Sequence, residues 1–176
     1  EQEKSKVRNQ LLRIDTETDS AAFKLNAINM LTKLRQISNH PKLIDPQSEI
    51  PSGKYEEVIS HLEQLWRAGQ KTLIFSSFTS HLEIYQRWCD EQKIKYALLT
   101  GATALPDRKV QVERFQKDKE VPFFFISLKA GEVGLNLTAA SYVLLLDPWW
   151  NPFAERQAIA RAHRLGQEQK VNVIRF

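Results

Sequence analysis

Two continuous apolar runs in the second half of the chain, residues 121–128 and 142–147, limit its fold more than any other feature. Neither run alternates apolar with polar residues, which indicates strands covered on both faces, as in the centre of a parallel sheet. Shorter strand-like segments lie at 71–75, 96–100 and 171–176, with helical patterns between the strands. Because parallel neighbours need crossover helices, the sequence predicts an α/β domain with a doubly wound, mostly parallel sheet flanked by helices.

The helices between these strands have recognisable ends. Ser52 can cap a helix that ends at Gly69, because a hydroxyl accepts hydrogen bonds from the first amides of a helix and glycine adopts the left-handed conformation beyond its end. Ser80 and Glu83 have the spacing of a capping box, which predicts that the next helix begins there. A further helix is expected around 108–115.

The first 45 residues show no strand pattern. Apolar residues recur there at helical spacing, and Pro41 is expected to end the helix; they are Ala22, Leu25, Ile28, Leu31, Leu34 and Ile37. Residues 45–53 have the composition of a linker. We therefore expect a helical extension over 1–45 and an α/β domain over 46–176, with its final strand cut short. The chain opens on Glu1 rather than Met, so a longer parent protein is also expected.

The composition narrows the classes of function. Apolar residues make up 42% of the chain, enough for a core, but no run approaches the ~20 residues that span a bilayer, so no membrane partner is expected. Cys89 is the only cysteine and the histidines are scattered, which argues against a disulfide framework and a metal site. A net charge of +4 permits contact with nucleic acid without requiring it.

One predicted helix near the end of the chain carries the strongest chemical signal. Asn151 can cap it and Pro152 fits its first turn. Gln157, Arg161 and Arg164 then recur at i, i+4 and i+7, so they share one face. Two guanidinium groups and an amide on one face can hold a polyanion such as a triphosphate. The alternative is a solvated basic face that binds no ligand.

Further candidate segments follow the predicted strands. Loops after the strands of a doubly wound sheet gather at its carboxyl edge, and four segments qualify: 76–79, 100–103, 127–136 and 147–152. Gly131 and Gly134 let the backbone approach a phosphate, and we expect their loop at the same edge as the arginine helix. Thr103 and Arg108 suit contacts to a nucleic-acid backbone, although a plain turn with a surface arginine is the alternative there.

What the sequence lacks is equally informative. It contains no Gly-x-x-x-x-Gly-Lys-Ser/Thr phosphate loop and no acidic pair after a strand to hold magnesium. Ser127, Asp147 and His163 do not indicate a hydrolase triad, because no Gly-x-Ser-x-Gly elbow surrounds any serine. The chain can therefore contribute arginines to a nucleotide but cannot cradle one alone, which predicts half of a binding site.

Six segments, in their order and spacing, resemble the motifs of the C-terminal RecA-like lobe of SWI2/SNF2-family ATPases, within helicase superfamily 2. They are residues 34–43, 72–79, 99–103 followed by Arg108 and Phe115, 127–137, 147–152 and 157–167. The resemblance implies a lobe of a motor that couples ATP hydrolysis to translocation along double-stranded DNA and displaces bound proteins or nucleosomes.

The resemblance also implies a role for each candidate residue. Arg161 and Arg164 would act as catalytic arginine fingers toward ATP, with Gln157 beside them. Residues that couple the nucleotide to DNA contact would be Gly131, Glu132, Gly134 and Asn136, and candidates for DNA-backbone contact are Ser76, Ser77, Thr103, Arg108 and Lys129. ATP with Mg²⁺ would be held mainly by the N-terminal RecA-like lobe of the same protein, and no metal is expected on this chain alone.

The expected partners are that first lobe, double-stranded DNA and proteins bound to it. They place the protein inside the cell, in the nucleus of a eukaryote or in the cytoplasm or nucleoid of a bacterium or archaeon. The parent would be a DNA-dependent ATPase, whereas the isolated lobe would be inactive and bind DNA weakly. Two alternatives remain: a non-catalytic DNA- or protein-binding module with the same fold, and a DEAD-box-type RNA helicase lobe. The latter fits less well, because Gln167 rather than arginine follows Gly166.

Overall fold

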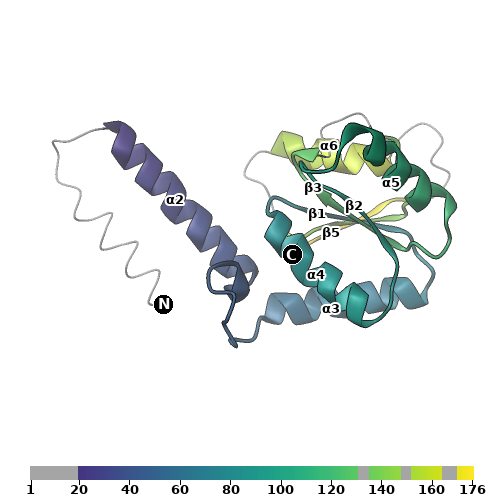
Figure 1. Ribbon diagram of the computed structural model, residues 1–176, viewed down its shortest axis with the longest axis horizontal. Coiled ribbons are helices and arrows are strands. Elements are labelled where there is room, and N and C mark those ends of the chain that lie inside the picture. The colour runs from purple at the N-terminus through teal and green to yellow at the C-terminus, as the bar shows by residue number, and fades with distance from the viewer. Residues whose placement is uncertain (1–19, 131–134, 148–151, 164–169) are drawn as a thin grey trace. The chain divides into compact units, whose positions relative to one another are not determined.

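The computed structural model describes residues 20–130, 135–147, 152–163 and 170–176 (Figure 1). The chain divides into two compact units, Glu1–Ser52 and Gly53–Phe176. The first unit contains helix α2 (Ser20–Asn39) and the short 3-10 helix η1 (Pro41–Leu43). The helix thus ends before Pro41, as the sequence predicts, because proline has no N–H to continue the hydrogen-bond ladder. Among the residues of α2 whose exposure is described, three large apolar side chains are exposed: Leu25, Ile28 and Leu31.

The second unit is built around a five-stranded sheet in the order β2-β3-β1-β4-β5. Every neighbouring pair is parallel, which confirms the predicted doubly wound sheet. The strands are β1 (Thr72–Ser76), β2 (Tyr96–Leu99), β3 (Phe123–Ser127), β4 (Tyr142–Leu145) and β5 (Asn172–Arg175). Every residue of β1 and β3 is buried, so these two strands form the centre of the domain.

Helices cover both faces of the sheet (Figure 1). α3 (Gly53–Arg67) and α4 (Thr79–Glu91) pack on one face, and α5 (Leu105–Lys117) and α6 (Pro152–Ala162) pack on the other. Leu73 and Phe75 belong to the core on the α5 and α6 side, whereas Ile74 belongs to the core on the α3 and α4 side. Two buried faces explain why the strands are apolar at successive positions.

Two helices end in the same left-handed turn. After α3, Gly69 has a φ of 65° and the Gln70 N–H donates to the Leu65 carbonyl at 2.9 Å. After α4, Lys93 has a φ of 57° and the Ile94 N–H donates to the Cys89 carbonyl at 2.8 Å. Both are Schellman-type ends, which favour glycine. The sequence signals the first through Gly69 and gives no such signal at Lys93.

The predicted capping box at the start of α4 is wrong. The N-cap residue is Phe78, which makes no side-chain capping bond, and Ser80 lies inside the first turn of the helix. The Phe78 N–H donates instead to the hydroxyl of Ser76 at 3.1 Å. This bond holds the turn that leads into α4, but it is not a capping bond, because its donor is the N-cap residue itself.

Candidate functional site

The turns after β1 and β3 leave the sheet side by side at its carboxyl edge. Ser76 and Ser127 end these two strands and are paired in register. The Leu128 N–H donates to the Ser76 carbonyl at 3.0 Å, so the ladder continues one residue further. Ser77 and Lys129 follow immediately, and the Lys129 side chain is exposed. The structure thus brings these two candidate DNA contacts onto adjacent turns.

Asp147 ties the end of β4 to the turn after β1. Its two carboxylate oxygens each lie 3.0 Å from the N–H of Ser77, and the Ser77 hydroxyl also donates to the carboxylate. Ser76 is fully buried, and its hydroxyl lies 3.3 Å from Nδ1 of His81. The Ser76 side chain therefore supports the turn from inside and does not reach the surface in this structure.

His81 completes this buried polar cluster. The ring is fully buried, with Nε2 at 3.3 Å from the hydroxyl of Tyr85 and Nδ1 at 3.9 Å from Asp147. Burial lowers the pKa of His81; Asp147 opposes this shift and the charge of Lys54 adds to it. Burial alone would raise the pKa of Asp147, but interactions with His81, Ser76 and Ser77 together outweigh it and hold that pKa below 3.8. The cluster therefore favours a neutral imidazole beside an ionised carboxylate.

The turn after β2 holds Thr103 and Arg108 together. The hydroxyl of Thr103 accepts a hydrogen bond from the Thr100 N–H at 3.0 Å, and the Thr103 carbonyl accepts one from Nε of Arg108 at 3.0 Å. Arg108 is half-buried in the first turn of α5. This bond uses one of five N–H donors of the guanidinium. The geometry fits both a phosphate contact and the simpler turn.

Gln157 and Arg161 lie together on α6. Both are half-buried and sit next to Ala158 and Ala162, which are buried against the sheet, and the Nε atom of Arg161 is itself buried. Because α6 connects the parallel strands β4 and β5, it runs back from the carboxyl edge. Arg161 lies nine residues after Pro152, about 14 Å along the axis at ~1.5 Å per residue. Arg161 therefore lies further from the carboxyl edge than the start of the helix, and the loop with Gly131 and Gly134, which was expected at the same edge, lies outside the described residues.

Two contacts fix α6 in the domain. The carboxylate of Glu155 lies 3.2 Å from Nε of Arg175 in β5, and the Glu155 side chain is only 13% exposed. At the other end, the Arg161 carbonyl accepts a hydrogen bond from the N–H of the buried Leu137 at 3.0 Å. The segment that follows the glycine loop is thereby joined to the helix that carries Gln157 and Arg161.

Several candidates lie outside the described residues, namely Gly131, Glu132, Gly134, Asn151 and Arg164. Of the proposed coupling group only Asn136 is described. It is exposed, and its carbonyl accepts a hydrogen bond from Nε2 of Gln116 at 3.1 Å.

Sequence reasoning missed three residues of this region. The sequence places Asp147 in the segment 147–152 at the carboxyl edge but gives it no role in holding a turn, and it indicates no role for His81 beyond arguing against a metal site. Helical spacing could have indicated His81, because it shares the buried face of α4 with Tyr85, four residues later. Gln116 offered no signal, because its partners are backbone atoms of a segment distant in sequence.

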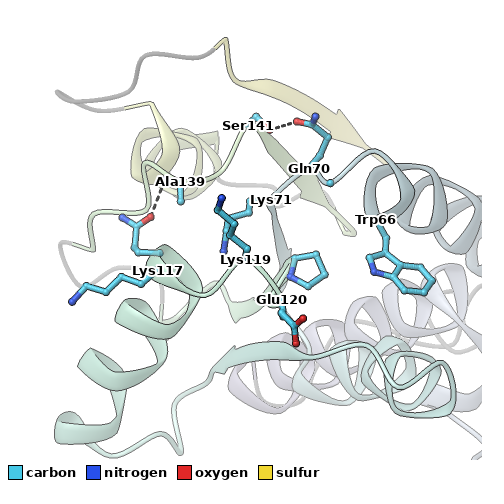
Figure 2. A pocket seen from close by; sticks show the side chains of 11 residues that line it. Trp66, Gln70, Lys71, Lys117, Lys119, Glu120, Ala139 and Ser141 are labelled. Carbon is cyan, nitrogen blue, oxygen red and sulfur yellow. Dashed lines mark hydrogen bonds between the residues drawn. The ribbon is translucent and has the colours of Figure 1, made fainter.

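A pocket of about 640 Å³ lies at the opposite, amino edge of the sheet (Figure 2). Two of its polar side chains are bonded within the protein: Gln70 accepts a hydrogen bond from the Ser141 hydroxyl at 2.7 Å, and the Lys71 ammonium donates to the carbonyls of Asp118 and Val121 at 2.8 and 3.1 Å. These bonds brace the beginnings of the strands. Gln116 and Ala139 line this pocket, whereas none of the candidate residues predicted from the sequence does.

Neither metal-binding groups nor membrane spans were found in the described part of the chain. No three His, Cys, Asp or Glu residues there are grouped so that they could hold a metal ion. No helix among the described residues is long and apolar enough to cross a bilayer.

Comparison with known proteins adds family information to this geometry. Residues 53–166 match the helicase conserved C-terminal domain. An uncharacterized ATP-dependent helicase of Schizosaccharomyces pombe is 41% identical over 75% of this chain and 13% of its own length. DNA repair protein RAD5A of Arabidopsis thaliana is 37% identical over 72% of this chain and 12% of its own. The chain thus spans about an eighth of the length of these relatives.

Two solved structures of SWI2/SNF2 ATPases are also similar to this chain. The C-terminal domain of the Sulfolobus solfataricus SWI2/SNF2 ATPase is 31% identical, with a TM-score of 0.74, and the match covers 86% of this chain and 67% of that one. The ATPase core from the same organism, in complex with double-stranded DNA, is 29% identical with a TM-score of 0.80. That match covers 99% of this chain and 37% of the core.

Proposed function

This chain belongs to the helicase conserved C-terminal domain family, as the C-terminal RecA-like lobe of a SWI2/SNF2-type ATPase, and we propose that it completes an ATP site held by the first lobe of its parent protein. The observation that carries the proposal is the pair Gln157 and Arg161 on one face of α6, beside residues buried against the sheet. A guanidinium held on a rigid element can stabilise the charge that develops during phosphoryl transfer. Arg164 belongs to the same face by its spacing.

ATP with Mg²⁺ is the cofactor in this proposal, and most of its contacts come from the first lobe. The sequence of this chain has no phosphate loop, whereas cationic and amide groups on α6 fit the phosphate end of the nucleotide. Arg161, Arg164 and Gln157 would face that end, and Mg²⁺ would neutralise charge on the phosphates. The chain alone is then an incomplete enzyme, with the first lobe as its necessary partner.

Double-stranded DNA is the second proposed partner. Ser77, Thr103, Arg108 and Lys129 follow β1, β2 and β3, which are adjacent in the sheet, so their turns form a row at the carboxyl edge. Hydroxyls and cations such as those of Thr103, Arg108 and Lys129 contact phosphates and position a protein on a duplex without reading its sequence. The N–H and the hydroxyl of Ser77 already donate to Asp147, so Ser77 would shape the turn beside these contacts. We propose that the parent translocates along DNA inside the cell and displaces proteins bound there.

The first test compares the parent protein with this chain alone. ATP hydrolysis by the parent should rise when duplex DNA is added, and the isolated chain should show no hydrolysis with or without DNA. Robust hydrolysis by the isolated chain would overturn the division of the site between two lobes. A parent that binds DNA but hydrolyses no ATP would instead identify a non-catalytic module with the same fold.

A further inference from the structure

We propose that Gln116 is a positioning residue that holds Arg161 in place, acting through the segment 136–139. The inference rests on the proposed function of Arg161. Gln116 lies in the last turns of α5, and Arg161 lies in the last turn of α6 on the same face of the sheet. The segment between them belongs to the loop that joins β3 to β4.

The side-chain amide of Gln116 clamps this segment at two points. Its Nε2 donates to the Asn136 carbonyl at 3.1 Å, and its Oε1 accepts from the Ala139 N–H at 2.8 Å. Figure 2 shows the second bond as the dashed line to Ala139. A glutamine can do both because its amide is donor and acceptor at once. Glutamate would keep only the acceptor, and methionine would keep neither.

The residue between these two points carries the connection to α6. The Leu137 N–H donates to the Arg161 carbonyl at 3.0 Å, and the Leu137 side chain is fully buried in the core with Phe115 and Ala162. Three hydrogen bonds therefore join α5, the 136–139 segment and the end of α6. Because the neighbours of Gln116 and of Arg161 share one packed core, a shift of the segment is transmitted to the backbone of Arg161.

The expected signature is a loss of turnover without a loss of nucleotide affinity. The first lobe is proposed to hold most of the ATP, so displacement of Arg161 should weaken transition-state stabilisation and leave ground-state binding almost unchanged. A small misplacement of a catalytic group can cost up to roughly a hundredfold in rate. General destabilisation of the lobe would lower the melting temperature without this separation of kcat from KM.

The experiment uses the full-length parent protein with Gln116→Met and Gln116→Glu. Gln111→Met is the matched control, because Gln111 also lies on α5 and its Oε1 accepts a hydrogen bond from a backbone N–H, that of Leu98 in the edge strand β2, at 3.2 Å. With saturating duplex DNA, Gln116→Met should lower kcat by roughly ten- to a hundredfold and change the KM for ATP by less than about twofold. Gln111→Met should leave kcat unchanged at a similar melting temperature.

A second measurement does not depend on activity. Hydrogen–deuterium exchange of the peptide that contains Leu137 should become faster in Gln116→Met and stay unchanged in Gln111→Met. If Gln116→Met does not fold, Gln116→Glu, which keeps the acceptor for Ala139, is read by the same two measurements. Equal losses of kcat in the Gln116 and Gln111 variants would overturn the inference.

The failure of the inference can be told apart from the failure of the proposed function. If Arg161→Ala abolishes turnover while both Gln116 variants keep full kcat and normal exchange, the positioning role is wrong and the proposed function stands. If Arg161→Ala leaves turnover intact, the proposed function is wrong and the inference falls with it.

Discussion

The backbone N–H of Ser77 lies 3.0 Å from both carboxylate oxygens of Asp147, so the turn after β1 is held by the end of β4. The buried, ionised carboxylate of Asp147 thus links the ends of β1 and β4 at the carboxyl edge. It also gives the edge a fixed shape, because Ser76 and His81 pack beneath the same turn. Several measurable consequences follow from this cluster and from the helices around it.

Substitution of Asp147 by Asn should lower the free energy of unfolding by about 2–3 kcal/mol, because the amide has no charge and replaces one of the two acceptor oxygens by a donor at a buried position. Urea denaturation at pH 7.5 measures this. The control is Asp118→Asn, whose carboxylate accepts the Glu120 N–H at 2.9 Å in an exposed turn and should lose less than about 1 kcal/mol. Equal losses in the two variants would contradict the role given to Asp147.

Acid should destabilise the fold in two steps. His81 has a pKa lowered from 6.5, so the unfolded chain takes up its proton first and stability falls as the pH drops below 6.5. Asp147 has a pKa lowered from 3.8, so its contribution is present above that value and is lost as the pH falls further. In the variant His81→Gln, the free energy of unfolding should fall less steeply just below pH 6.5. An unchanged profile of urea midpoint against pH would show that His81 is not responsible.

The two left-handed helix ends should respond in opposite directions to exchange of glycine. Gly69→Ala should cost about 1 kcal/mol through backbone strain alone, because an added Cβ meets no atom within 4 Å. Lys93→Gly should raise stability by up to about 1 kcal/mol, since glycine relieves the φ of 57°. Thermal or urea unfolding of each single variant measures whether stability falls in Gly69→Ala and rises in Lys93→Gly. Destabilisation by Lys93→Gly would contradict the assigned conformation.

Binding of duplex DNA by this chain should weaken steeply with salt, because cations that contact phosphates release counterions. Removing Arg108 or Lys129 with alanine should reduce the slope of log K against log salt by about 1 each. The control is Arg87→Ala, an exposed residue of α4 away from the carboxyl-edge turns. Fluorescence anisotropy at several salt concentrations measures the slope. Identical slopes for all four proteins would remove Arg108 and Lys129 from the interface.

Much of the fold could be predicted from the sequence, because burial on both faces leaves a strong pattern. The runs at 121–128 and 142–147 contain β3 and β4, and Gly69 marks a helix end. The predicted cap at Ser80 failed for a local reason. The helix α4 begins at Thr79, with Phe78 as its N-cap residue, so Ser80 already lies inside the first turn despite its spacing to Glu83.

The candidate site was less predictable than the fold. Residue types and spacing indicated Gln157 and Arg161, but the direction of α6 follows from the parallel pairing of β4 with β5, which places Arg161 away from the carboxyl edge. Ser76 resembled a surface hydroxyl in sequence and is fully buried. Gln116 could not be found at all, because its partners are main-chain atoms of residues 20 and 23 positions further along the chain.

The most direct measurement of the central claim is the DNA-stimulated ATPase rate of the parent protein with Arg161→Ala, with Arg156→Ala as the control. Arg156 is exposed on the same helix, five residues earlier, outside the proposed face. Loss of an arginine finger is worth roughly 10³ to 10⁵ in rate, so Arg161→Ala should nearly abolish turnover. Arg156→Ala should hydrolyse ATP as the unmodified protein does. Wild-type turnover in Arg161→Ala would contradict the claim that this lobe completes the ATP site.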